Sequence, residues 1–145
     1  MKVYYSYDFK ENLSKSQKNI SENNIVKASF KFFKVNKIKN ISMITYHRRY
    51  FLSKLKKIFG IDFVDALCKR GNYRYKDNQV EIVNDKVIPQ FNSNHVLVYF
   101  LDFDSLEKLM GNFPDKTFLW IPSNTCQVNK LLKKYEAINI FEDFK

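Results

Sequence analysis

The chain of 145 residues is long enough for one domain with a complete hydrophobic core and too short for two of ordinary size. Hydrophobic side chains make up 45% of it, and fourteen Phe and nine Tyr against three Gly and three Pro exclude a disordered chain. The formal net charge of +10 arises between Lys27 and Lys76, where fourteen Lys and Arg stand beside two acids, whereas residues 77–145 carry ten acids and seven bases. This separation excludes an evenly charged surface and favours a positive region that attracts polyanions.

The N-terminal part of the chain predicts two strands, and the structure type of the segment between them stays open. Residues 2–7 are aromatic and β-branched, which favours a first strand, and residues 8–24 are polar enough for a loop or an exposed helix. Residues 25–35 carry three Phe among lysines, and their spacing fits a strand as far as Phe32 and a helix about as well. Both types stay open for that segment. Residues 41–46 predict a buried strand.

A basic helix pair is expected next. Residues 48–59 repeat apolar side chains at helical spacing, and Gly60 is a suitable C-terminal stop. Asp62 is expected to cap a second helix that ends at Gly71. The sequence therefore predicts two helices joined by a tight turn.

A β-hairpin or meander follows the helix pair. Residues 72–91 alternate strand-forming side chains with turn pairs at 77–78 and 84–85, which predicts three short strands, with Pro89 at an edge or a strand end. Two helices followed by a hairpin resemble a winged helix in the order of elements, over residues 48–91. That resemblance implies a second helix that enters a DNA groove.

The last third of the chain predicts alternating strands and helices. The strands are expected at 96–101, 117–121 and 137–141, and the helices at 105–110, capped by Asp104, and near 125–135. Apolar runs without alternation suit a parallel sheet that is covered on both faces. We therefore expect a single α/β domain over residues 1–145, with a mainly parallel sheet. It ends in a β-α-β-α-β unit at about 95–142 and carries an inserted basic helix pair and a hairpin at about 47–91.

The strongest candidate site is cationic. Nine Lys and Arg lie in the helix pair and hairpin: Arg48, Arg49, Lys54, Lys56, Lys57, Lys69, Arg70, Arg74 and Lys76. Several cations on one surface suit phosphate binding, and the interleaved Tyr50, Tyr73 and Tyr75 add rings that can stack the bases of a single strand. The alternative is that the lysines solvate the outer faces of amphipathic helices. We expect a nucleic-acid-binding protein that contacts phosphates of DNA or RNA through this helix pair.

A second candidate site is the sequence Asp102-Phe103-Asp104 directly after the strand at 96–101. Two carboxylates at the carboxyl end of a parallel strand suit a shared Mg²⁺ ion. The alternative makes Asp104 a helix cap and Asp102 a solvated residue at the strand end.

A strand followed by Asp-x-Asp resembles the opening of haloacid dehalogenase phosphatases and one element of Toprim nucleases and primases. The resemblance implies Mg²⁺-dependent phosphatase or nuclease chemistry. The sequence departs from the first pattern because the strand comes late in the chain and Ser105-Leu106-Glu107 replaces a small, glycine-containing stretch. It departs from the second because the nearest upstream glutamate, Glu81, lies inside a predicted hairpin strand.

Three further positions carry polar side chains at strand ends. The turn at 122–125 offers amides to an anion or, in the simpler interpretation, caps a helix. Glu142 and Asp143 follow the last strand and are placed to join Asp102 at one edge of the sheet. His47 follows the strand at 41–46 and is a candidate phosphate contact or general base.

The remaining signals concern compartment and partner. Cys68 and Cys126 have no metal-site spacing and are expected as reduced, mostly buried thiols. Without an apolar signal core, or any stretch approaching roughly 18 apolar residues, we expect a cytoplasmic protein with no membrane partner. Besides nucleic acid, the partner considered is an acidic protein surface, contacted by an interaction or inhibitor module of a phage or mobile element. No cofactor other than the possible Mg²⁺ is expected, and enzymatic activity and oligomeric state stay open.

Overall fold

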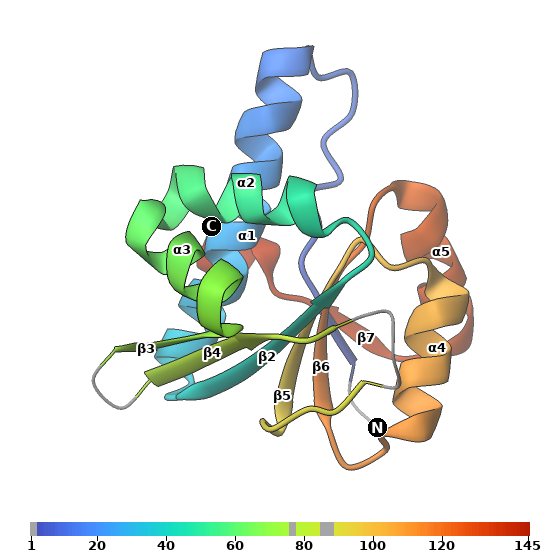
Figure 1. Ribbon diagram of the computed structural model, residues 1–145. Coiled ribbons are helices and arrows are strands. Elements are labelled where there is room, and N and C mark those ends of the chain that lie inside the picture. The colour runs from blue at the N-terminus through green and yellow to red at the C-terminus, as the bar shows by residue number, and fades with distance from the viewer. Residues whose placement is uncertain (1–2, 76–77, 85–88) are drawn as a thin grey trace.

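A computed structural model describes residues 3–75, 78–84 and 89–145 and confirms an α/β fold with a mostly parallel sheet (Figure 1). The strands are β1 (Val3–Tyr5), β2 (Asn40–Thr45), β3 (Asn72–Tyr75), β4 (Asn78–Ile82), β5 (His95–Tyr99), β6 (Thr117–Ile121) and β7 (Ala137–Asn139). The helices are α1 (Lys15–Val35), α2 (Arg48–Phe59), α3 (Ile61–Arg70), α4 (Phe103–Asn112), α5 (Thr125–Lys134) and α6 (Phe141–Phe144).

The strands form one sheet in the order β3-β4-β2-β5-β6-β1-β7. All neighbours are parallel except β3, which pairs antiparallel with β4. The carboxyl ends of the parallel strands therefore share one edge, called the carboxyl edge below. The expected β-α-β-α-β unit is present as β5-α4-β6-α5-β7, but β1 lies between β6 and β7 and pairs with both.

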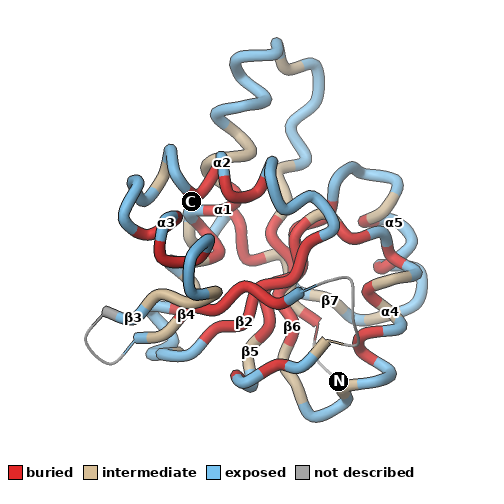
Figure 2. The backbone as a smooth tube through the Cα atoms, in the orientation of Figure 1, coloured by how far each residue is buried: buried red, intermediate tan, exposed pale blue. Residues whose placement is uncertain are grey.

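The helices cover the sheet on both faces. Helices α1, α2, α3 and α6 lie on one face, and α4 and α5 lie on the other (Figure 1). Successive residues of β5 serve the two layers in turn: Leu97 packs under α1 and α2, whereas Val96 and Val98 pack under α4 and α5. Figure 2 shows the resulting buried band through the central strands. This burial on both faces explains why the strands lack polar alternation.

The basic helix pair is not an insertion. Helices α2 and α3 form the crossover that joins β2 to its parallel neighbour β4. The hairpin β3-β4 belongs to the edge of the same sheet, so the likeness to a winged helix stops at the order of elements. Residues 87 and 88 of the expected third strand and one residue of each predicted turn pair, 77 and 85, lie outside the described residues.

Two helix starts differ from the prediction. Helix α3 begins at Ile61 after Gly60, and the Asp62 side chain makes no cap but lies in the first turn, where its charge suits the helix dipole. Helix α4 begins earlier than expected, at Phe103, with Asp102 rather than Asp104 as the N-cap. Gly71 ends α3 at a φ of 74°, as expected for a left-handed C-cap.

The open segment at 25–35 belongs to the 21-residue helix α1. A capping box starts this helix: the Ser14 hydroxyl accepts the Gln17 N–H, and the Gln17 side chain accepts the Ser14 N–H. The first turns of α1 and the preceding loop project beyond the carboxyl edge and are largely exposed (Figures 1 and 2). Within the described ranges, no helix is both long and apolar enough to span a bilayer.

Candidate nucleic-acid interface

The structure separates the nine predicted cationic residues into three groups. Arg48, Arg49, Lys56 and Lys57 on α2, Lys69 and Arg70 on α3, and Arg74 on β3 are exposed. Lys54 is buried, with 6% of its surface exposed. Lys76 lies outside the described residues.

Helix α2 divides cleanly into an apolar and a cationic face. Phe51, Leu52 and Leu55 are buried in the layer under the helix. Arg49, Lys56 and Lys57 are spaced i, i+7 and i+8, which places them on one outer stripe. The same amphipathic spacing that attaches α2 to the sheet therefore presents three cations to solvent.

Lys54 is the exception, because it points toward α1. Its ammonium lies 2.7 Å from Glu22 Oε2 and 3.4 Å from Asn23 Oδ1, and 5.2 Å from the centre of the Tyr50 ring. The Tyr50 hydroxyl donates to the same Glu22 oxygen at 2.5 Å. Burial and this bond to Glu22 raise the pKa of Tyr50 to about 12, so the hydroxyl stays a donor at neutral pH. Lys54 thus joins two helices and is not available to a phosphate.

Helix α1 supplies a second cationic stripe that the sequence analysis did not assign to the site. Lys27, Lys31 and Lys34 are exposed and follow the spacing i, i+4 and i+7. Helix α1 lies beside α2, joined by the contact of Phe30 with Phe59 at 4.8 Å as well as by the pair of Lys54 and Glu22. The lysine spacing could have indicated this stripe, but only once residues 25–35 were known to be helical.

The outer face of α3 is balanced in charge. Asp62 and Asp65 line one shallow hollow of about 450 Å³ together with Lys69 and Arg70. The strongest positive region therefore lies on α1 and α2 rather than on α2 and α3. We call this region the cationic face and define it by six residues: Lys27, Lys31, Lys34, Arg49, Lys56 and Lys57.

The cationic face is not neutralised by acids of the described part of the chain, where none of its six residues has an ion-pair partner. The two other ion pairs of the described residues involve different lysines: Lys134 is 2.7 Å from Glu107, and Lys145 is 2.8 Å from Glu142. Two acids of the C-terminal half, Glu107 and Glu142, therefore pair with nearby lysines of that half.

At the second predicted site, one of the two acids, Asp102, has a structural role as a helix cap. Asp102 accepts the Ser105 hydroxyl at 2.6 Å and the Ser105 N–H at 3.3 Å, as the N-cap of α4. These bonds lower the pKa of Asp102, the hydroxyl contributing most. Asp104 is exposed. No group of three or more His, Cys, Asp or Glu within the described ranges is placed to hold a metal, and a Mg²⁺ ion at this pair stays a prediction.

The turn at 122–125 lies close to Asp102 at the carboxyl edge. Asn124 caps α5 by accepting the Gln127 N–H at 3.1 Å, and the Gln127 side chain accepts the Phe103 N–H at 2.7 Å. The starts of α4 and α5 are thereby joined. This agrees with the helix-capping interpretation of the turn.

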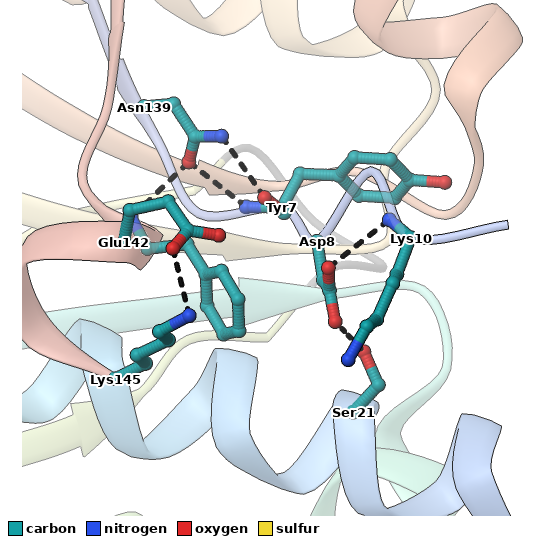
Figure 3. A network of polar contacts seen from close by, with 8 residues as sticks. Tyr7, Asp8, Lys10, Ser21, Asn139, Glu142 and Lys145 are labelled. Carbon is teal, nitrogen blue, oxygen red and sulfur yellow. Dashed lines mark hydrogen bonds and ion pairs between the residues drawn. The ribbon is translucent and has the colours of Figure 1, made fainter.

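Glu142 is held away from Asp102, since β1 and β6 lie between β7 and β5. Figure 3 shows the contacts at that end of the carboxyl edge. The Asn139 side chain accepts the Tyr7 and Phe141 N–H groups and donates to the Tyr7 carbonyl, while Asp8 accepts the Ser21 hydroxyl at 2.8 Å. These bonds fix the loop that leads into α1.

His47 occupies the N-cap position of α2, where its side chain makes no capping bond. Its ring lies 6.2 Å from Phe100, edge to face, and it has no acidic or nucleophilic partner among the described residues.

The prediction of buried thiols is wrong, because Cys68 and Cys126 are both exposed on the outer sides of α3 and α5.

Fold and site together define an α/β protein whose mainly parallel sheet is covered on one face by a layer of helices, of which α1 and α2 carry exposed cations. No protein-family model matches the chain, and no curated protein or solved structure is significantly similar to it.

Proposed function

We propose that this protein binds nucleic acid through the cationic face, by contacts with phosphates. The observation that carries the proposal is a cationic stripe on each of the neighbouring helices α1 and α2, whose exposed cations have no acidic partner in the described part of the chain. Cations without partners release the counterions of a polyanion on binding, which is the main source of affinity for a phosphate backbone.

The test is a charge reversal of one stripe. The variant with Arg49→Glu, Lys56→Glu and Lys57→Glu should lose binding to labelled single-stranded and duplex oligonucleotides in fluorescence anisotropy. Wild-type affinity should fall steeply between about 50 and 200 mM salt, and the salt slope should be smaller in the variant.

The matched control reverses three exposed lysines on the opposite face of the sheet, Lys108, Lys130 and Lys133. It changes the net charge by the same amount, so it should keep most of the affinity if the cationic face is the site. Equal loss in both variants would show that overall charge, and not this face, attracts the ligand. Absence of binding by the wild type at low salt would refute the proposal.

An acidic protein surface is the second candidate ligand for the same face. It is favoured by Phe59 and Ile61, which are 42% and 54% exposed at the turn between α2 and α3, since exposed apolar side chains beside charge are typical of protein interfaces. Competition between an oligonucleotide and polyglutamate of matched length distinguishes these two candidate ligands. A nucleic-acid site should prefer the oligonucleotide strongly, whereas competition by polyglutamate at equal charge concentration would favour the protein partner.

A further inference from the structure

An aromatic stack runs from the core to the surface at the carboxyl edge. The rings of Phe51 and Tyr99 stack at 4.3 Å, those of Tyr99 and Phe100 at 4.1 Å, and those of Phe100 and Tyr50 at 6.1 Å. Phe51 and Tyr99 are fully buried, Phe100 is half-buried and Tyr50 is 44% exposed. The stack therefore ends in rings that solvent reaches.

The backbone is strained where the stack reaches the edge. Phe100 has a φ of 57°, in the left-handed region that a bulky residue rarely adopts. The Phe100 N–H donates to the Ile121 carbonyl at 2.9 Å. The carbonyl of the following residue, Leu101, accepts the Trp120 indole N–H at 3.0 Å. This conformation breaks the alternation of β5, so that Tyr99 and Phe100 stack on the same side. Backbone conformations that are this unfavourable are frequent at ligand-binding sites.

The stack also lies where two adjacent strands of the sheet lead into helices on opposite faces. From β2 the chain enters α2 on one face of the sheet, and from the adjacent β5 it enters α4 on the other face (Figure 1). In open α/β sheets, ligands bind in the crevice at such a switch point, outside the carboxyl ends of the strands. Arg48 and Arg49 begin α2 there, exposed and without ion-pair partners in the described ranges.

We propose that Tyr50 and Phe100 stack a base of single-stranded nucleic acid while Arg48 and Arg49 hold the adjoining phosphates. This inference rests on the proposed function and specifies its ligand. Stacking on an exposed ring needs a base whose face is free, which a single strand offers and the interior of a duplex does not. Positive charge beside the rings complements the phosphates that flank such a base.

The test compares two substitutions of one residue. Tyr50→Leu removes the ring, whereas Tyr50→Phe keeps it, and both remove the hydroxyl bond to Glu22. Tyr50→Leu should weaken binding to a single-stranded oligonucleotide about tenfold, as expected for one lost stacking contact, and leave duplex binding nearly unchanged. Tyr50→Phe should bind as the wild type does. Phe59→Leu is the matched control, because Phe59 is 42% exposed at the other end of the same helix.

A single strand that carries 2-aminopurine supplies a readout independent of affinity. Its fluorescence should be quenched on binding to the wild type and to Tyr50→Phe, and less so with Tyr50→Leu. Unchanged single-strand affinity and quenching in Tyr50→Leu would overturn the inference, as would an equal loss for the duplex. Both results leave phosphate binding by the cationic face intact, whereas a wild type that binds neither ligand refutes the proposed function instead.

Discussion

The ammonium of Lys54 lies 2.7 Å from the carboxylate of Glu22, so the one inward-facing lysine of α2 joins this helix to α1. Breaking a largely buried pair leaves the remaining charge without its partner. Lys54→Met should therefore lower the free energy of unfolding by about 1–3 kcal/mol, measured by urea denaturation. Adding Glu22→Gln should recover part of that loss. A Lys54→Met protein as stable as the wild type would show that the pair contributes nothing.

Lys57→Met removes the same charge from the exposed stripe. It should leave stability within about 0.5 kcal/mol of the wild type, as surface substitutions usually do, but weaken oligonucleotide binding. Lys54→Met should have the opposite profile, with lower stability and nearly unchanged affinity. The two variants thus separate structural from ligand-binding lysines on one helix. Equal losses of affinity would contradict the assignment of Lys54 to a structural role.

Tyr99 carries a buried hydroxyl for which the described part of the chain offers no hydrogen-bond partner. Burial raises the pKa of this hydroxyl, with the nearby Tyr50 and Glu22 contributing less. An unsatisfied buried hydroxyl costs about 1–3 kcal/mol, so Tyr99→Phe should raise the free energy of unfolding by about 1 kcal/mol. Tyr50→Phe, which removes a hydroxyl bonded to Glu22, should lower it. Destabilisation by Tyr99→Phe in urea denaturation would show that the hydroxyl is bonded.

Glycine usually destabilises a protein more than alanine does, but the left-handed backbone at Phe100 should reverse this order of stability. Alanine at a φ of 57° keeps the strain of a β-carbon, whereas glycine does not, so Phe100→Gly should be about 1 kcal/mol more stable than Phe100→Ala. Phe113 is a half-buried control with a φ of −130°. There the glycine variant should be the less stable one. The same order at both positions, measured by thermal unfolding, would disprove the strain.

The C-terminal half was the part of the fold best predicted from the sequence. Apolar runs such as 96–101 and 117–121 have no alternation, and this pattern at strand length is typical of a strand buried on both faces. The place of β1 between β6 and β7 was not predictable, because a buried strand of three residues carries no signal of its neighbours. Strand order depends on how helices pack over the sheet, and a local pattern does not contain it.

Helix α1 shows why the type of an aromatic segment can stay ambiguous. Phe30, Phe32 and Phe33 lie close together, so their rings contact several elements instead of defining one face. The capping box of Ser14 and Gln17 was the stronger signal for a helix, but it lies thirteen residues or more before these rings. The helix type in turn decides whether the neighbouring lysines form a stripe.

The charge of the candidate site was predictable, but its shape was not. Lys54 points inward because it pairs with Glu22, which is distant in sequence. The outer face of α3 is balanced in charge because its acids and cations lie around the same hollow. The strained Phe100 has no sequence signal, since glycine or asparagine would be expected at a positive φ. A site built from long-range contacts appears only with the fold.

His95 should make stability depend on pH near neutrality. It is half-buried at the start of β5, its ring lies 6.5 Å from Phe33, and burial lowers its pKa below the ordinary 6.5. Lys37 and Lys39 line the same hollow as His95. The unfolded chain then binds more protons than the folded one between the lowered pKa and 6.5, so stability falls as the pH drops through that window.

His95→Gln should remove this dependence. Urea denaturation from pH 7.5 down to about 5 should show the wild type losing stability relative to the variant, by about 1.4 kcal/mol for each unit by which the pKa is lowered. His47→Gln is the control at the exposed histidine. Parallel pH profiles of the wild type and His95→Gln would mean that another group controls the dependence.

Asp102 allows the helix cap and the predicted Mg²⁺ site to be tested separately. Alanine cannot accept the Ser105 N–H, so Asp102→Ala should lose about 1 kcal/mol of stability, whereas asparagine caps as well as aspartate and Asp102→Asn should lose little. A metal ligand has the opposite requirement, since it needs the charge of the carboxylate. Metal that binds the folded state raises the melting temperature by mass action. Melting with and without Mg²⁺ therefore decides: a rise in the wild type that Asp102→Asn abolishes would establish the metal site, and no rise in either would leave Asp102 as a cap.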